Sequence, residues 1–169
     1  AKNLCRVLAH RLATADEVIA RHMPVKGDAG TADSYHRKAS DKAELARLDR
    51  QASVMVDQEV ALLKSLGLAD GQKVLDVGCG AGGLAIAMAK HLPGADVLGV
   101  DPNPVLTARA EEALAKAGVD NCRFKVGNGL ALPLLDEGRD FVVSRLVLQH
   151  LSAPGEAVSE MRRVLQPGG

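Results

Sequence analysis

The sequence predicts an α/β fold built on a doubly wound, mainly parallel sheet, with a helical extension in front of it. Three observations lead to this fold class. Short apolar segments alternate with helical segments from Gly71 onward, a pattern typical of parallel sheets that are covered by helices on both faces. The first third of the chain shows helical periodicity alone. A glycine-rich segment beginning at Gly78 lies where a predicted strand passes into a helix.

Residues 1–68 are expected to form a helical extension or lid. Apolar side chains recur at helical spacing near the N-terminus. A longer helix is predicted from about Asp41 to Leu66, because its apolar residues form one stripe and Gly67 follows its last turn.

Residues 69–169 are expected to form the second domain, the core that carries the sheet. Strands are predicted at Lys73–Val77, Asp96–Val100, Arg123–Val126 and Phe141–Ser144. Helices are predicted at Gly82–His91, Pro104–Ala117 and Pro154–Leu165. The last helix runs into Pro167, Gly168 and Gly169, which is a turn that normally leads to another strand. We therefore expect a sheet that is truncated before its fifth strand.

Composition argues against several classes of partner. Lys and Arg number 21, as do Asp and Glu, so the formal net charge is zero and no basic field attracts a phosphate backbone. Aromatic residues make up only 2% of the chain, too few for base-stacking platforms. We expect no nucleic acid as partner, and no membrane span, because no apolar run approaches about 20 residues.

The cysteines indicate neither a metal centre nor a disulfide framework. Cys5, Cys79 and Cys122 are odd in number and contain no C-x-x-C pair. We expect small buried thiols in a reducing cytoplasm, and no metal.

The segment from Val74 to Gly83 is the most informative stretch, because an apolar strand runs into glycines and then into a helix. Glycines let a ligand approach the backbone, and the helix N-terminus favours a polar ligand group. Asp101 ends the next strand, where a carboxylate can accept hydrogen bonds from both hydroxyls of a ribose. The spacing also fits a dinucleotide fingerprint. Asp76 favours a cationic ligand instead, because its charge would repel a pyrophosphate.

These segments together resemble the class I S-adenosylmethionine-dependent methyltransferases, which have a Rossmann-like fold. The resemblance covers nearly all of residues 71–169, with every motif in order. The motif sequences are most similar to those of small-molecule methyltransferases of the quinone-biosynthesis type. The segments that carry it are Val74–Gly82, Val100–Asn103, Gly127–Pro133, Asp140–Arg145 and Met161–Gly169.

The resemblance implies S-adenosylmethionine as cofactor, S-adenosylhomocysteine as product, and a role for each matching residue. Asp76 would lie near the methionyl amino group, with Arg145 lining the same end of the pocket. Asp101 would hold the ribose, and Leu130 would pack on the adenine. Asn128 stands where many members carry Asp, which predicts a weaker bond to the adenine amino group. The implied cofactor-binding residues are Asp76, Gly78, Cys79, Gly80, Asp101, Pro102, Asn128, Gly129, Leu130 and Arg145.

No catalytic group is evident from the sequence. His150 is a weak candidate for a general base, and a packed histidine is the more common arrangement in such an apolar stretch. Arg47 and Gln51 lie one helical turn apart and could reach one pocket together with Tyr35, although a solvated helix face is more common.

The sequence therefore predicts a methyltransferase that transfers a methyl group to a small-molecule acceptor in the cytoplasm. Three alternatives stay open. They are a degenerate domain that binds the cofactor without catalysis, an NAD(P)-dependent oxidoreductase, and a methyltransferase acting on protein or RNA. A homodimer is also left open.

Overall fold

The computed structural model describes residues 56–169, so the expectations for the N-terminal helices and for Tyr35, Arg47 and Gln51 lie outside the described residues. Residues 56–65 are helical, within the long helix predicted up to Leu66. The strands are β1 (Lys73–Val77), β2 (Asp96–Asp101), β3 (Cys122–Val126) and β4 (Phe141–Ser144). The helices are α4 (Gly83–His91), α5 (Pro104–Ala117), the short 3₁₀ helix η1 (Leu148–His150) and α6 (Pro154–Val164). The strands and the helices α4, α5 and α6 differ from the predicted bounds by one residue at most, whereas η1 was not predicted.

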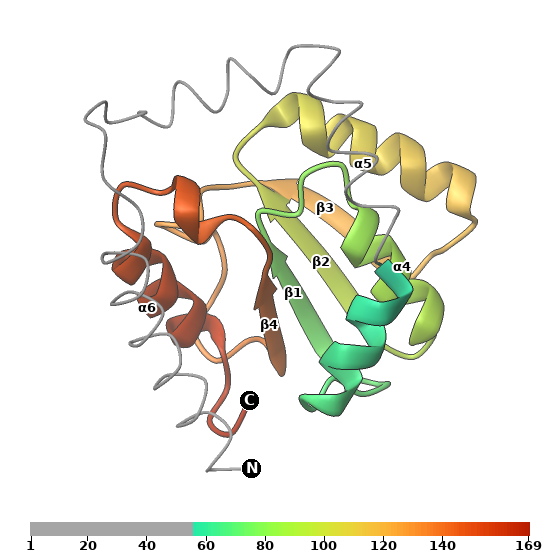
Figure 1. Ribbon diagram of the computed structural model, residues 1–169, viewed down its shortest axis with the longest axis horizontal. Coiled ribbons are helices and arrows are strands. Elements are labelled where there is room, and N and C mark those ends of the chain that lie inside the picture. Colours follow the sequence, from blue (N-terminus) through green and yellow to red (C-terminus); the bar gives the residue numbers. More distant parts are fainter. Residues whose placement is uncertain (1–55) are drawn as a thin grey trace.

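The sheet has the strand order β3-β2-β1-β4, and every pairing is parallel. Parallel neighbours need a crossover connection, which α4 and α5 supply between β1, β2 and β3. The predicted parallel sheet is thereby confirmed. Because the strands are parallel, the carboxyl ends of β1, β2 and β4 lie at the same edge of the sheet, as Figure 1 shows.

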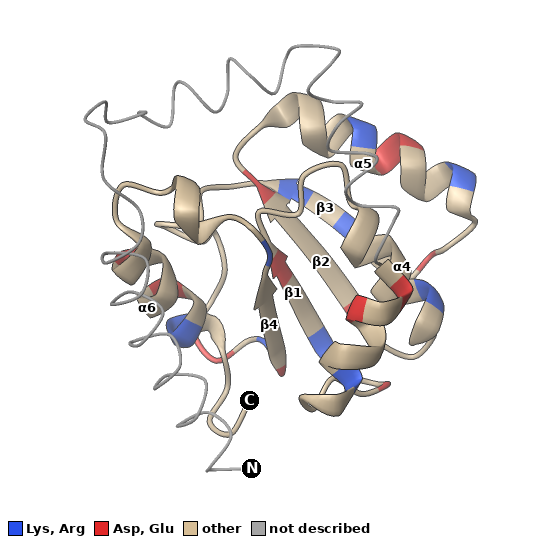
Figure 2. Ribbon diagram, in the orientation of Figure 1, with Lys and Arg blue, Asp and Glu red and all other residues tan. Residues whose placement is uncertain are grey.

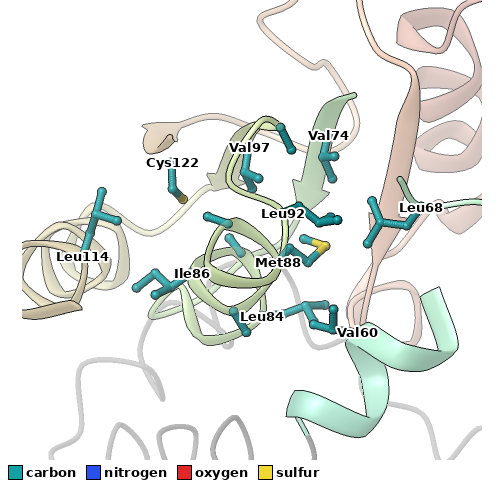
Figure 3. Close-up of a cluster of buried hydrophobic side chains, with 14 residues drawn as sticks. Val60, Leu68, Val74, Leu84, Ile86, Met88, Leu92, Val97, Leu114 and Cys122 are labelled. Atoms are coloured by element: carbon teal, nitrogen blue, oxygen red, sulfur yellow. The ribbon is translucent and has the colours of Figure 1, made fainter. Parts of the chain in front are cut away.

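Helices cover the sheet on both faces, with α4 and α5 on one face and α6 on the other (Figure 1). Two apolar clusters result. The first lies between the sheet, α4 and the helix at 56–65, and includes Val60, Val74 and Met88 (Figure 3). The second lies under α6 and includes Leu75 and Val164. Consecutive strand residues thus belong to opposite clusters, as the alternation of side chains along a strand requires.

Local signals explain where α5 begins and ends. The Asn103 side chain accepts a hydrogen bond from the Val105 N–H at 2.9 Å, and Pro104 occupies the first turn. Gly118 closes the helix in the left-handed conformation, with φ 64°. These are the start and stop signals from which the helix was predicted.

The segment after α6 returns to the sheet beside the start of β4. The Arg139 N–H donates to the Val164 carbonyl at 2.9 Å, and the Gln166 N–H donates to the Arg139 carbonyl at 2.8 Å. A fifth strand beyond residue 169 stays a prediction. Over residues 56–169, no helix has the length and apolar character that a bilayer crossing requires.

Candidate functional site

Charged side chains gather where β1, β2 and β4 end. Asp76 is the penultimate residue of β1, Asp101 is the last residue of β2, and Arg145 directly follows β4. Figure 2 shows the acidic positions at the carboxyl ends of β1 and β2. Ligands of open parallel sheets bind outside this edge. The structure therefore brings together three residues that the sequence analysis had assigned to one site.

The Asp101 carboxylate ties the glycine turn to the loop after β2. One of its oxygens accepts a hydrogen bond from the Gly80 N–H at 2.9 Å, and the other accepts one from the Asn103 N–H at 2.9 Å. The side chain is only 1% exposed. Asp101 therefore orders the two loops that a ligand at this edge would contact, a task that the sequence analysis did not foresee.

Two glycines of the turn meet different surroundings. A Cβ added to Gly78 would lie 2.2 Å from a methyl carbon of Val147, so the segment after β4 packs directly on this residue. A Cβ added to Gly80 would meet nothing within 4 Å, and its φ is 56°. Gly80 thus combines a left-handed backbone with open space, which lets a ligand approach the turn.

Asp76 is a buried carboxyl with a strongly altered proton affinity. Burial raises its pKa from the usual 3.8 to about 7, the Arg145 charge opposes the rise, and Asp101 and Glu59 add to it. A buried carboxyl is costly to ionise, and a cationic ligand group would relieve that cost.

Arg145 pairs with Glu59, a residue of the helix at 56–65. Arg145 was predicted from its place after a strand, whereas nothing in the pattern of the helix at 56–65 marks Glu59 for the site. Ser144 was not predicted either; its hydroxyl donates to the Val77 carbonyl at 3.0 Å and joins the ends of β1 and β4.

Cys79 and Pro102 belong to the same turns. The Cys79 thiol points into the core, since a Cβ added to Gly99 would lie 2.8 Å from its sulfur. Burial raises the pKa of this thiol, so it is neutral. Pro102 is partly exposed beside Asp101. Cys79 and Cys122 are both buried and unpaired, which agrees with the thiols expected from the sequence.

Asn128, Gly129 and Leu130 form a turn after β3. The Asn128 side-chain oxygen accepts a hydrogen bond from the Leu130 N–H at 2.9 Å, and its backbone oxygen accepts one from the Ala131 N–H at 3.1 Å. Gly129 packs close to β1, because an added Cβ would lie 3.2 Å from a methyl carbon of Val77. The turn therefore lies beside the end of β1, with the Asn128 side chain exposed.

His150 ends the short helix η1 and is exposed. The expectation of a packed histidine is therefore wrong. The physical reason is that Leu148–His150 forms a single 3₁₀ turn at the surface and not a helix packed against the core.

A separate groove of about 530 Å³ lies between the helix at 56–65, α4 and α5. It contains none of the strand-end residues Asp76, Asp101 and Arg145, so we do not assign the ligand to it. The groove is lined by Val56, Asp57, Ala81, Gly83, Ile86, Ala87, Lys90, His91, Ala113, Lys116 and Ala117.

In the described part of the chain, no group of three or more His, Cys, Asp or Glu side chains could hold a metal ion.

The residues at the strand ends fit a ligand that is cationic at one end and carries hydroxyl groups. Asp76 offers a buried negative charge, and Gly80 leaves room beside it. The sequence profile of one known family, described as "methyltransferase domain", matches residues 74–169 of this chain. The chain belongs to the class I S-adenosylmethionine-dependent methyltransferases. The Rossmann-like sheet and the parallel topology are those of this family.

Two methyltransferases of known sequence and one of known structure illustrate the relationship. An uncharacterized methyltransferase of Schizosaccharomyces pombe is 40% identical over 103 residues, which cover 57% of this chain and 37% of that protein. A demethylmenaquinone methyltransferase of Staphylococcus aureus is 33% identical over 109 residues, which cover 64% of this chain and 44% of that protein.

The structure is that of phosphoethanolamine N-methyltransferase 2 of Haemonchus contortus, solved with phosphomonomethylethanolamine and S-adenosylhomocysteine. It is 32% identical and superimposes with a TM-score of 0.61, over 67% of this chain and 26% of that chain. The chain thus spans less than half the length of each of these three methyltransferases.

Proposed function

We propose that this chain binds S-adenosylmethionine at the carboxyl ends of β1 and β2 and acts as the cofactor half of a methyltransferase for a small-molecule acceptor. One observation carries the proposal: the buried Asp76 carboxyl has a pKa of about 7 beside an open turn at Gly80. A site of this kind favours a ligand with a cationic end over one with a pyrophosphate, because the phosphates would add negative charge to it.

In this proposal, different residues bind different parts of the ligand. Asp76 takes the methionyl amino group, with Arg145 at the same end. The backbone of Gly78, Cys79 and Gly80 lies along the methionyl chain. This division leaves Asp76 ionised when the cofactor is bound, because the opposite charge stabilises the carboxylate.

Asp101 and Pro102 take the ribose end of the ligand in this proposal. Each Asp101 oxygen accepts one backbone N–H, and a carboxylate oxygen can accept more than one hydrogen bond, so the ribose hydroxyl groups can donate to the same side chain. Asn128, Gly129 and Leu130 take the adenine.

The cofactor supplies an already activated methyl group, so the chain has to orient an acceptor and exclude water. The names of two relatives support a small acceptor, because one acts on demethylmenaquinone and the other was solved with phosphomonomethylethanolamine. The zero net charge supports neither a DNA nor an RNA acceptor. The quinone-type resemblance, the cytoplasmic location, the two-domain division at residue 68 and a homodimer stay predictions.

Calorimetry with the full chain tests the proposal. We expect S-adenosylhomocysteine to bind and NAD⁺ to give no signal at the same concentration. Asp76→Asn replaces a charged partner with a neutral one and should weaken binding about tenfold at pH 8. Asp120→Asn, an exposed carboxyl after α5, is the control and should leave the affinity unchanged. Binding of NAD⁺ in preference to S-adenosylhomocysteine would contradict the proposal.

A second experiment concerns the acceptor. Transfer of a labelled methyl group from S-adenosylmethionine is measured on a panel of small phenols, amines and quinols, with bulk RNA and a protein mixture alongside. We expect label in one of the small acceptors. Label confined to RNA or protein contradicts a small-molecule acceptor while leaving the cofactor site intact.

A further inference from the structure

Glu59 and Arg145 form an ion pair between two segments that lie 86 residues apart. Glu59 belongs to the helix at 56–65, which precedes the matched family region, and Arg145 directly follows β4. The side chains are only 28% and 23% exposed. The pair is therefore screened less by solvent than a surface ion pair.

The pair lies at the end of β1, because β4 pairs with β1 so that Val143 is opposite Asp76 and Arg145 follows two residues later. Both charges of the pair act on the Asp76 carboxyl. Asp101 also acts on Asp76, so this carboxyl is within reach of two other carboxyl groups and one guanidinium. The charge of Asp76 in turn acts on the thiols of Cys79 and Cys122. Arg145 is thus the basic group in this set, and the charge that the site presents to a ligand depends on where its guanidinium lies.

The backbone constrains Arg145 on both sides. Before it, Ser144 is held to the end of β1 by the hydrogen bond from its hydroxyl to the Val77 carbonyl. After it, Leu146 has a φ of 58°, a left-handed conformation that costs a residue with a side chain about 1 kcal/mol. The chain therefore bends at Leu146, directly after Arg145. The guanidinium lies at the end of a long side chain, and its ion pair with Glu59 restricts where it lies.

We propose that Glu59 is a positioning residue of the cofactor site, whose carboxylate holds the Arg145 guanidinium beside Asp76. The inference rests on the proposed function and deepens it. On this inference the helix at 56–65 is part of the site. Through Glu59 it determines how close the positive charge of Arg145 lies to Asp76, and so how negative the site is toward the cationic end of the cofactor.

The sign of the expected effect follows from the charges. When Glu59 no longer holds Arg145, Asp76 loses its nearby positive charge, so its proton binds more tightly. The pH at which S-adenosylhomocysteine binding reaches half its full strength then rises. A rise of about one pH unit corresponds to about fivefold weaker binding at pH 7. Loss of the direct Glu59 charge alone has the opposite sign, because that charge raises the pKa of Asp76.

The test measures the dissociation constant of S-adenosylhomocysteine by calorimetry from about pH 6 to about pH 8.5, with the full chain. We expect the midpoint to rise in Glu59→Gln and in Arg145→Gln. In the double variant it should lie no higher than in Arg145→Gln, because only the direct charge of Glu59 is then left to lose. Asp57→Asn, on the same helix as Glu59, alters the contact with His91 of α4 and should leave the midpoint in place.

Glu59→Asp provides an independent variant, because it keeps the charge and shortens the reach to Arg145 by one methylene. It should raise the midpoint as Glu59→Gln does. A midpoint that stays in place or falls in the Glu59 variants overturns the positioning role, as do additive effects in the double variant. If the unaltered chain fails to bind S-adenosylhomocysteine at any pH, the proposed function itself is wrong.

Discussion

Burial makes the Asp76 carboxyl hard to ionise, and the same burial suits it to the proposed site. It is 2% exposed, and burial raises its pKa to about 7. A carboxyl of this kind resists ionisation in the folded chain, and that resistance is relieved by a cation placed beside it. Stability is often lower where a site is prepared for a ligand, and Asp76 is the clearest such position among the described residues.

Asp76→Asn should therefore stabilise the chain at alkaline pH. Below about pH 4 the carboxyl is protonated in the folded chain and largely so in the unfolded one, and the variants should be alike. Between about pH 4 and pH 7 the unfolded chain is ionised at this position while the folded chain keeps the proton, so the free energy of unfolding of the unaltered chain falls relative to the variant. The fall reaches up to about 4 kcal/mol and levels off above pH 7, where both states are ionised. Urea unfolding at about pH 4 and pH 8 measures this difference. A variant that is less stable at pH 8 would show that the carboxylate is well satisfied in the free protein.

The position of Asp101 could be predicted from the sequence, but its hydrogen bonds could not. Its place at the end of β2 was predictable, because a carboxylate after an apolar strand is a recognisable pattern. Its hydrogen bonds to the Gly80 and Asn103 N–H groups were not, because they depend on how the two loops pack. Asp101 therefore has a structural task that exists before any ribose binds.

The glycines of the turn between β1 and α4 have two different roles, close packing and access for a ligand, which cannot be told apart in the sequence. Gly78 is in van der Waals contact with the segment after β4, through Val147. Gly80 faces open space and has no such neighbour. The turn thus packs on the protein at one glycine and leaves room for a ligand at the other.

Alanine at these two positions should separate stability from binding. Gly78→Ala forces a Cβ to 2.2 Å from a Val147 methyl carbon and should lower the free energy of unfolding by about 3 kcal/mol. Gly80→Ala meets no neighbour and should cost only about 1 kcal/mol for its left-handed backbone. Its affinity for S-adenosylhomocysteine should nevertheless fall at least tenfold. Thermal unfolding with calorimetry on the same samples measures both. Equal losses of stability would refute the distinction.

The two faces of the sheet are held by different means. The face under α4 is covered by a large apolar cluster, whereas α6 adds a polar anchor to a smaller one. Arg163 of α6 donates to the Leu132 and Leu134 carbonyl oxygens at 3.1 and 3.0 Å. It also pairs with Asp136 and Glu160. One guanidinium therefore joins α6 to the loop between β3 and β4 through several hydrogen bonds.

Arg163→Gln should lower the melting temperature by several degrees, because two carbonyl groups and two carboxylates lose one shared donor. Arg163→Lys should restore little, since an ammonium cannot reproduce the planar set of donors. Arg162→Gln, at the exposed neighbouring position on α6, is the control and should melt as the unaltered chain does. Differential scanning calorimetry compares the three. Equal melting of the Arg162 and Arg163 variants would show that the anchor is unimportant.

From residue 73 onward, every strand and helix of the sheet layers was predictable to within one residue at each end, and so was the strand edge that carries Asp76 and Asp101. Periodicity, glycines and caps act over a few neighbouring positions, so a linear pattern suffices for them. The pairing of Glu59 with Arg145, the burial that raises the pKa of Asp76, and the surface position of His150 were decided by packing. These properties depend on which distant segments meet in space, and no local pattern contains that information.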